Sequence, residues 1–249
     1  MRWETATGHF RQKKVNLTGP TGRVVILMVA TVMAGVLLGW MLPRVSMPFA
    51  RLTGRYHATG NAAEALAGLA VEDEVSSAGY SRDVFGYRET DEDGNGCDVR
   101  DDVLAKDLTD VVYATRGGCV VKSGILEDPY TGTTIQFMRG RSTSSAVQID
   151  HVVALQNAWQ SGAKDWDHDK RLRYGNDPYN LLAVDGPANQ DKGAASAAYW
   201  LPSNESFQCE YVARQIGVKA KYGLTVTSAE QRAMLTILHG CPGQALPSE

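Results

Sequence analysis

The feature that most constrains this chain is an uninterrupted apolar run near its N-terminus. Residues 24–42 read VVILMVATVMAGVLLGWML, nineteen residues without a charge. A helix needs about twenty apolar residues to cross the hydrocarbon core of a bilayer, so the run predicts a transmembrane anchor or the core of a signal peptide. Five basic residues precede it and three follow closely, which favours residues 1–23 in the cytoplasm and the remainder outside the cell.

The flank after this run favours an uncleaved anchor. Residues 43–48 read PRVSMP and contain no good small-x-small cleavage site. The predicted location is therefore the cell membrane, crossed once, with the C-terminal domain extracellular. The alternative is secretion after cleavage of a signal peptide.

The rest of the chain divides into a linker, a domain and a tail. Residues 43–75 have few large apolar side chains and are interpreted as a stalk. Residues 76–241 are long enough for one compact domain, and residues 242–249 form a C-terminal tail. The formal net charge of −3 argues against a protein that binds nucleic acid through bulk charge alone, but it is compatible with an enzyme that has a local basic groove.

Two helices joined by a short turn are expected at the C-terminal end of the domain. Residues 207–222 place apolar side chains on one helical face, and Gly223 marks the stop. Thr227 and Glu230 have the spacing of a capping box at the start of a second helix, which ends at Gly240. Because helices joined in this way pack antiparallel, the start of the first lies beside the end of the second.

That arrangement predicts how the four cysteines pair. All of them follow the apolar run, in a compartment where disulfides persist. Cys209 at the start of the first helix lies beside Cys241 at the end of the second, which leaves Cys97 to pair with Cys119. Each closed loop contributes on the order of 3 to 4 kcal/mol in the chain-entropy model. The alternative is four free, buried thiols.

Residues 146–192 contain the side chains with the clearest chemistry. The segments 146–149 and 180–184 are rich in β-forming residues. Residues 187–192 begin with a proline, which is typical of the first turn of a helix. The expected order is therefore strand, insertion, strand, helix.

This region offers metal ligands and a base. Asp150 and the amide oxygen of Asn189 are ligands that suit a hard cation such as Mg²⁺, which keeps several waters. His151, with an ordinary pKa of about 6.5, is the neighbouring side chain able to accept a proton at neutral pH. Adjacent strand residues point to opposite faces, so we expect the chain to bend here. Asn180 is placed to bond either the backbone of that bend or the imidazole.

The pattern resembles the HNH endonucleases, also called ββα-metal nucleases. Its positions are the Asp-His pair at 150–151, the Asn-Leu pair at 180–181, and Asn189 with the following Lys192. Over roughly residues 80–241 the chain is similar to the exported bacterial branch of that family, which resembles GmrSD-type HNH domains. The segments that carry this likeness are DPYTG at 128–132, IDHVVAL at 149–155, AW at 158–159, NDP at 176–178, WLP at 200–202 and KAKYGL at 219–224.

The resemblance implies an α+β fold with a ββα-metal core and an insertion between its two strands. Flanking helices, including the C-terminal helical hairpin, and one N-terminal transmembrane helix complete the expected architecture. It also implies that Asp150 and Asn189 bind Mg²⁺ or Mn²⁺, that His151 is the general base and that Asn180 orients it.

The implied activity is metal-dependent hydrolysis of phosphodiester bonds in nucleic acid outside the cytoplasm. DNA is the expected substrate, with low sequence specificity and no obligate protein partner. The cations expected to contact substrate phosphates are Lys192, Arg139 and Arg141. The chain departs from the family at its last position, where Asn189 replaces a frequent His and favours Mg²⁺ or Mn²⁺ over softer metals. It also lacks the family's zinc knuckles, which the two disulfides replace as cross-links.

A second motif supports a different class of function. Asp91, Asp93 and Asn95, with Asp102 at the twelfth position, follow the ligand spacing of an EF-hand, except that Asp replaces the usual Glu. No clear helix precedes the motif, and Cys97 pins its end. The alternative function is a membrane-tethered calcium-binding surface module with a degenerate, inactive HNH domain, in which Ca²⁺ is structural.

Two further readings concern residues outside these motifs. His168 lies among Asp167, Asp169 and Lys170, and is interpreted as a surface residue. The sequence contains no GxSxG motif, which disfavours a serine hydrolase.

Overall fold

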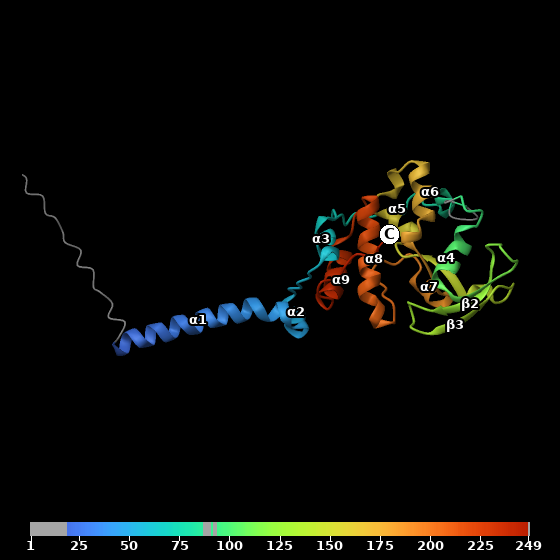
Figure 1. Ribbon diagram of the computed structural model, residues 1–249. Coiled ribbons are helices and arrows are strands. Elements are labelled where there is room, and N and C mark those ends of the chain that lie inside the picture. The colour runs from blue at the N-terminus through green and yellow to red at the C-terminus, as the bar shows by residue number, and fades with distance from the viewer. Residues whose placement is uncertain (1–18, 87–90, 92–93, 249) are drawn as a thin grey trace, which may run out of the picture. The chain divides into compact units, whose positions relative to one another are not determined.

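The structure, a computed structural model, describes residues 19–86, 91 and 94–248 (Figure 1). The described residues divide into two compact units, one up to residue 55 and one from residue 56 onward, which are described separately.

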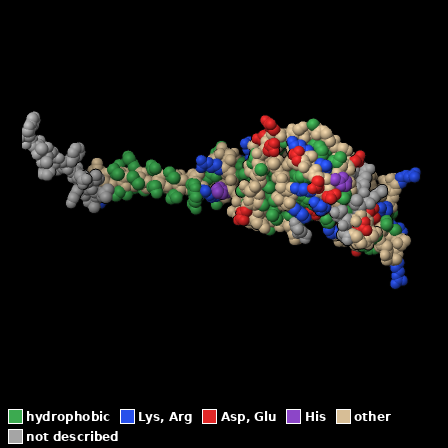
Figure 2. All heavy atoms as spheres, turned by 90° about the horizontal axis from the view of Figure 1, so that it is seen from above, with side chains coloured by type: hydrophobic (Ala, Val, Ile, Leu, Met, Phe, Trp, Pro, Cys, Tyr) green, Lys and Arg blue, Asp and Glu red, His purple; other side chains and the backbone are tan. Residues whose placement is uncertain are grey.

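The first unit contains the apolar run as a single long helix. Helix α1 (Pro20–Val45) begins with a proline in its first turn and is followed, after Ser46 in an extended conformation, by α2 (Met47–Thr53). Figure 2 shows hydrophobic side chains along the length of α1. Among the described residues it is the one helix long and apolar enough to cross a membrane, with a mean hydropathy of 2.4. The expected helix over residues 24–42 is confirmed and extends further at both ends.

The second unit begins earlier than the sequence indicated. Helix α3 (Asn61–Gly68) buries Ala62 and Leu66 completely in the same hydrophobic cluster as side chains of α8 and α9. The backbone of Val226 bonds to Ala70 and Glu72. The interpretation of residues 43–75 as a stalk is therefore wrong from residue 56 onward, because small side chains such as alanine pack a helix closely without large apolar groups.

The C-terminal tail also packs on this helix. The backbone nitrogen of Ala62 donates to the Gln244 carbonyl at 3.2 Å, and the Asn61 side chain accepts from the backbone of Leu246 at 2.7 Å. Residues 242–248 thus contribute to the compact unit and are not a free tail.

A three-stranded antiparallel sheet forms one side of the second unit. Its order is β1 (Thr109–Tyr113), β2 (Val121–Glu127) and β3 (Thr134–Met138). Helix α4 (Val99–Asp107) buries Val103 and Leu104 in a cluster with residues of this sheet and of β5. The predicted Cys97–Cys119 disulfide is confirmed, and it ties the segment before α4 to the β1–β2 connection.

The predicted order of strand, insertion, strand and helix is confirmed. Strand β4 (Val147–His151) pairs antiparallel with β5 (Leu181–Asp185), so that Asp150 lies opposite Leu182. Helix α7 (Gly186–Lys192) follows directly and packs on both strands. Short 3-10 turns precede these elements at η1 (Arg82–Phe85) and η2 (Ser144–Ala146). The insertion consists of α5 (Leu155–Gln160), η3 (Ala163–Asp165), α6 (His168–Asn176) and η4 (Pro178–Asn180).

The C-terminal helical hairpin follows the prediction closely. A 3-10 turn, η5 (Glu205–Phe207), leads into α8 (Gln208–Tyr222), which ends at a left-handed Gly223. Helix α9 (Ser228–His239) is capped at its start by Thr227, whose hydroxyl accepts from the Glu230 nitrogen at 3.1 Å. The predicted Cys209–Cys241 disulfide is confirmed and joins the two ends of the hairpin.

Candidate active site

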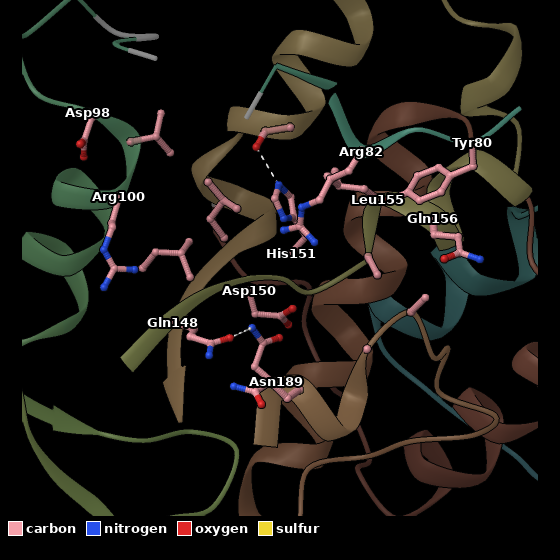
Figure 3. A pocket seen from close by; sticks show the side chains of 18 residues that line it. Tyr80, Arg82, Asp98, Arg100, Gln148, Asp150, His151, Leu155, Gln156 and Asn189 are labelled. Carbon is pink, nitrogen blue, oxygen red and sulfur yellow. Dashed lines mark hydrogen bonds between the residues drawn. The ribbon is translucent and has the colours of Figure 1, made fainter. Parts of the chain in front are cut away.

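A cavity of about 910 Å³ lies along the end of β4 (Figure 3). Four consecutive residues of that strand, 148–151, line it. Because successive strand residues point to opposite faces, a cavity that all four reach runs along the strand's edge. Among the described residues β4 pairs with β5 alone, which leaves that edge open. An open edge is how the adjacent Asp150 and His151 both reach the cavity.

His151 is held as a neutral imidazole with a defined tautomer. Its Nε2 lies 2.8 Å from the carbonyl oxygen of Gly175, at the end of α6. Since a carbonyl can only accept, Nε2 carries the hydrogen and Nδ1 has the lone pair. Burial lowers the pKa of His151 to about 3, and the positive charges of Arg82 and Lys192 act in the same direction, whereas the Gly175 bond raises it. The ring is therefore neutral at physiological pH.

Gly175 also brings another segment to this cavity. A Cβ at residue 175 would lie 2.6 Å from the Phe85 carbonyl oxygen, so the close approach of α6 to η1 requires a glycine. Helix η1 begins with Arg82, which lines the cavity together with His151 (Figure 3).

Asn180 holds the bend that follows β4. Its Oδ1 accepts from the Val153 nitrogen at 2.9 Å, its Nδ2 donates to the Val153 carbonyl at 3.3 Å, and its own carbonyl accepts from Val152 at 2.8 Å. The side chain is completely buried. Asn180 was expected to bond either the backbone of the bend or the imidazole, and these contacts are bonds to the backbone.

Asp150 is buried and held on two sides. The Tyr130 hydroxyl donates to Oδ2 at 2.5 Å, and the Lys192 ammonium lies 2.9 Å from Oδ2 and 3.0 Å from Oδ1. Burial raises the pKa of Asp150, while Lys192 and the Tyr130 bond lower it. Lys192 is 1% exposed and also donates to the His151 carbonyl. The expectation that Lys192 contacts substrate phosphate is therefore wrong, because its ammonium is buried and bonds to Asp150 and to the His151 carbonyl.

Asn189 presents an amide oxygen to the same cavity. Its Nδ2 donates to Gln148 Oε1 at 2.9 Å, which fixes the orientation of the amide (Figure 3). In the part of the chain that the structure describes, no three His, Cys, Asp or Glu side chains come together as a metal-binding group. Asp98 and further amide side chains also line the cavity, and the two expected donors are one carboxylate, Asp150, and one amide oxygen, Asn189. This set fits Mg²⁺ or Mn²⁺, which commonly take one or two protein oxygens and complete their shell with water and phosphate.

The arginines expected to bind phosphate do not line this cavity. Arg139 pairs with Asp101 and donates to the Val121 carbonyl, so it stabilises the sheet, and Arg141 is exposed on the following loop. The cavity is lined instead by Arg82 and Arg100.

Sequence reasoning also missed Tyr130, Gln148 and the two cavity arginines as site residues. Arg100 comes from α4 and is anchored by donating to the Ser144 and Val147 carbonyls at 3.3 and 3.0 Å. Nothing local marks Tyr130, Arg82 or Arg100, because tertiary packing brings them to β4, whereas Gln148 lies on β4 itself. Tyr130 did lie in the DPYTG segment that supported the family resemblance.

The acidic loop before α4 bonds to itself. Asp91 accepts from the Gly96 nitrogen at 2.8 Å, and Asn95 Nδ2 donates to Asp102 at 3.0 Å. Asp93 lies outside the described residues. A calcium ion in this loop stays a prediction.

Comparison with known proteins places the chain in a family. The sequence model of one protein family, the GmrSD restriction endonuclease C-terminal domain, matches residues 98–237, more than half of the chain. An uncharacterized secreted protein of Arthroderma benhamiae is 39% identical over 178 residues, which cover 71% of this chain and 82% of that protein. No solved structure matches. The matched span includes β4, β5 and α7, and the chain therefore belongs to the family of GmrSD restriction endonuclease C-terminal domains.

Proposed function

We propose that this protein is an HNH-type, metal-dependent endonuclease that hydrolyses phosphodiester bonds of nucleic acid outside the cytoplasm. The observation that carries the proposal is the meeting of three groups in one cavity. These are a neutral imidazole at His151, a carboxylate at Asp150 and an oriented amide at Asn189. DNA is the proposed substrate, cut with low sequence specificity.

His151 is the proposed general base. Its Nδ1 accepts a proton from the attacking water while the water oxygen bonds to phosphorus and the bond from phosphorus to the leaving oxygen breaks. The Gly175 carbonyl holds the ring, and Asn180 holds the bend that carries it. A pKa of about 3 describes the ring without substrate. A phosphate anion beside the ring favours the protonated form and raises that pKa in the complex.

Asp150 and Asn189 are the proposed ligands of Mg²⁺ or Mn²⁺, which when bound neutralises charge that develops on the phosphate and leaving oxygen. Arg82 and Arg100 supply two positive charges on the walls of the cavity, against the one carboxylate of Asp98. Together with a buried Asp150–Lys192 pair that is neutral overall, these arginines favour a polyanionic substrate.

The proposed location follows from three features. The relative is a secreted protein, two disulfides are present, and α1 is apolar and long enough to span a bilayer. We propose that α1 is an uncleaved anchor that holds the catalytic unit on the outer face of the cell membrane.

Degradation of plasmid DNA and of RNA by the full chain in detergent micelles tests the function. Activity is expected with Mg²⁺ or Mn²⁺ and is expected to stop with EDTA. His151→Ala should lower the rate by about 10² to 10⁴ while the protein stays folded. His168→Ala is the matched control, because that histidine is 73% exposed and lies outside the cavity. Intact DNA and RNA with every metal would contradict the proposal, and stabilisation by Ca²⁺ without cleavage would favour the calcium-binding alternative.

A further inference from the structure

We propose that Lys192 is a positioning residue that keeps Asp150 in a neutral ion pair and thereby makes binding of the divalent ion depend on the substrate phosphate. This inference rests on the proposed function, because it concerns the metal that Asp150 and Asn189 would hold.

The contacts of Lys192 show how completely its charge is committed. Its ammonium lies within 3.0 Å of both oxygens of Asp150 and 2.9 Å from the His151 carbonyl oxygen. The Lys192 side chain is fully buried, and that of Asp150 is 6% exposed. The three bonds account for the three donors of an ammonium group.

The ammonium reaches the carboxylate from the interior of the protein. Asp150 lines the cavity, whereas Lys192 does not. Each carboxylate oxygen has more than one lone pair, so the carboxylate can bond Lys192 and Tyr130 and still offer electrons to a ligand in the cavity. Lys192 therefore modifies the charge of the site without filling the space of a metal ion.

Helix α7 carries both the proposed metal ligand Asn189 and the positioning residue Lys192. Asn189 and Lys192 are three residues apart on the same helix, so they lie on one face of it. Asn189 meets Gln148 of β4, and Lys192 meets Asp150 of the same strand. The helix thus fixes a neutral amide donor and an ammonium against one strand.

The resulting donor set has no net charge. One carboxylate is balanced by one ammonium, and the amides of Asn189 and Gln148 are neutral. A divalent ion that enters alone gains attraction from Asp150 and loses part of it to repulsion by Lys192, while Arg82 and Arg100 on the cavity walls add repulsion and Asp98 adds attraction. A phosphodiester supplies the missing negative charge. Metal and substrate should therefore bind more tightly together than apart, and by linkage each raises the affinity of the other.

The test measures Mn²⁺ binding to the full chain in micelles, without nucleic acid, from the electron paramagnetic resonance signal of free Mn²⁺. Lys192→Gln removes the charge and keeps a hydrogen-bond donor, and it should bind Mn²⁺ about tenfold more tightly or better. Lys192→Arg keeps the charge and should bind like the wild type. Lys219→Gln is the matched control, since Lys219 is another fully buried lysine paired with a carboxylate, Glu230, outside the cavity. It should leave Mn²⁺ affinity unchanged.

A purely structural Lys192 predicts the opposite result. Its loss would then loosen Asp150 and weaken Mn²⁺ binding, or leave it unchanged, and either result in folded Lys192→Gln would overturn the proposal. If that variant does not fold, the wild type decides. Mn²⁺ should bind more tightly in the presence of a saturating phosphorothioate oligothymidine, and equal affinity with and without it would overturn the proposal. Asp150→Asn separates the two hypotheses, because wild-type Mn²⁺ binding that survives this change would refute the proposed metal site itself.

Discussion

Among the residues that the structure describes, two lysine–carboxylate pairs are buried, and they differ in what surrounds them. Lys192 meets Asp150 at 2.9 Å beside the cavity, and Lys219 meets Glu230 at 3.2 Å between α8 and α9. Both lysine side chains are fully buried. Lys219 also donates to the Ser161 hydroxyl and the Thr225 carbonyl, so its pair connects the helical hairpin to the insertion.

The comparison teaches that a buried ion pair does not by itself identify a functional carboxylate. Burial lowers the pKa of Lys219 and raises that of Asp150, as desolvation does to any ionisable group. What distinguishes Asp150 is its second side, which faces a cavity shared with His151 and Asn189. Glu230 does not line that cavity. The first pair is therefore assigned to chemistry and the second to stability.

The largest expected effect separates the two carboxylates by activity. Asp150→Asn should lower the rate of DNA cleavage per folded molecule by at least about 10²-fold, since even the outer partners of metal sites are worth about 10- to 100-fold. Glu230→Gln should retain the wild-type rate per folded molecule. Cleavage assays normalised to the folded fraction from circular dichroism make the comparison. Similar losses in both variants would remove the distinction between the pairs.

The next effect separates them by stability. Lys219→Met leaves Glu230 buried without its partner, and we expect a loss of about 3 to 5 kcal/mol in the free energy of unfolding. The double variant Lys219→Met/Glu230→Met should recover most of this loss, because it removes both buried charges. Urea unfolding of the full chain measures both values. A loss below about 1 kcal/mol, typical of an exposed pair, would contradict the assigned structural role.

Helix α3 packs in the same hydrophobic cluster as α8 and α9, and its contribution to stability can be measured in the same way. Leu66 is 1% exposed in the cluster that includes α8 and α9, so Leu66→Ala should cost about 2 to 5 kcal/mol. Leu52 of α2 is 81% exposed and supplies the control, with an expected change within about 0.5 kcal/mol. Equal, small effects at both positions would restore the interpretation of residues 56–75 as a stalk.

The last prediction, whose effect is smallest per pH unit, is a pH dependence of stability that belongs to the cavity side. The pKa of His151 is about 3 in the folded protein and near 6.5 when unfolded, so between these values the unfolded chain binds a proton that the folded chain does not. This contribution to stability is complete above pH 6.5 and is lost as the pH falls towards 3, by up to about 1.4 kcal/mol per pH unit. His151→Gln should flatten the dependence, while Asp150, whose shift acts in the opposite direction, is present in both proteins. Parallel pH profiles of wild type and variant in urea unfolding would argue against a buried neutral ring.

The sequence predicted those features that local signals encode. The helical hairpin follows from the Gly223 stop and the Thr227 cap, and the disulfide pairing follows from the hairpin. The order of strand, insertion, strand and helix follows from two segments rich in β-forming residues and from the proline at the start of α7. In each case a few neighbouring residues determine the backbone conformation.

The remaining features depend on contacts between segments far apart in the chain. The sequence predicts that Lys192, three residues after Asn189, contacts substrate phosphate, but the packing of α7 on β4 buries it against Asp150. Arg82 reaches the cavity because Gly175 lets two helices approach. The alanines of α3 suggest a spacer, because an alanine side chain occurs both in exposed and in buried positions and so gives no sign of burial in the sequence.

Anomalous diffraction from crystals grown with Mn²⁺ and a short phosphorothioate DNA tests the central claim most directly. The account predicts a manganese peak bonded to both the Asp150 carboxylate and the Asn189 amide oxygen, with a DNA phosphate beside it and His151 facing that phosphate. A peak at the Asp91 loop alone, or an Asn189 side chain turned away from a metal at Asp150, would contradict it.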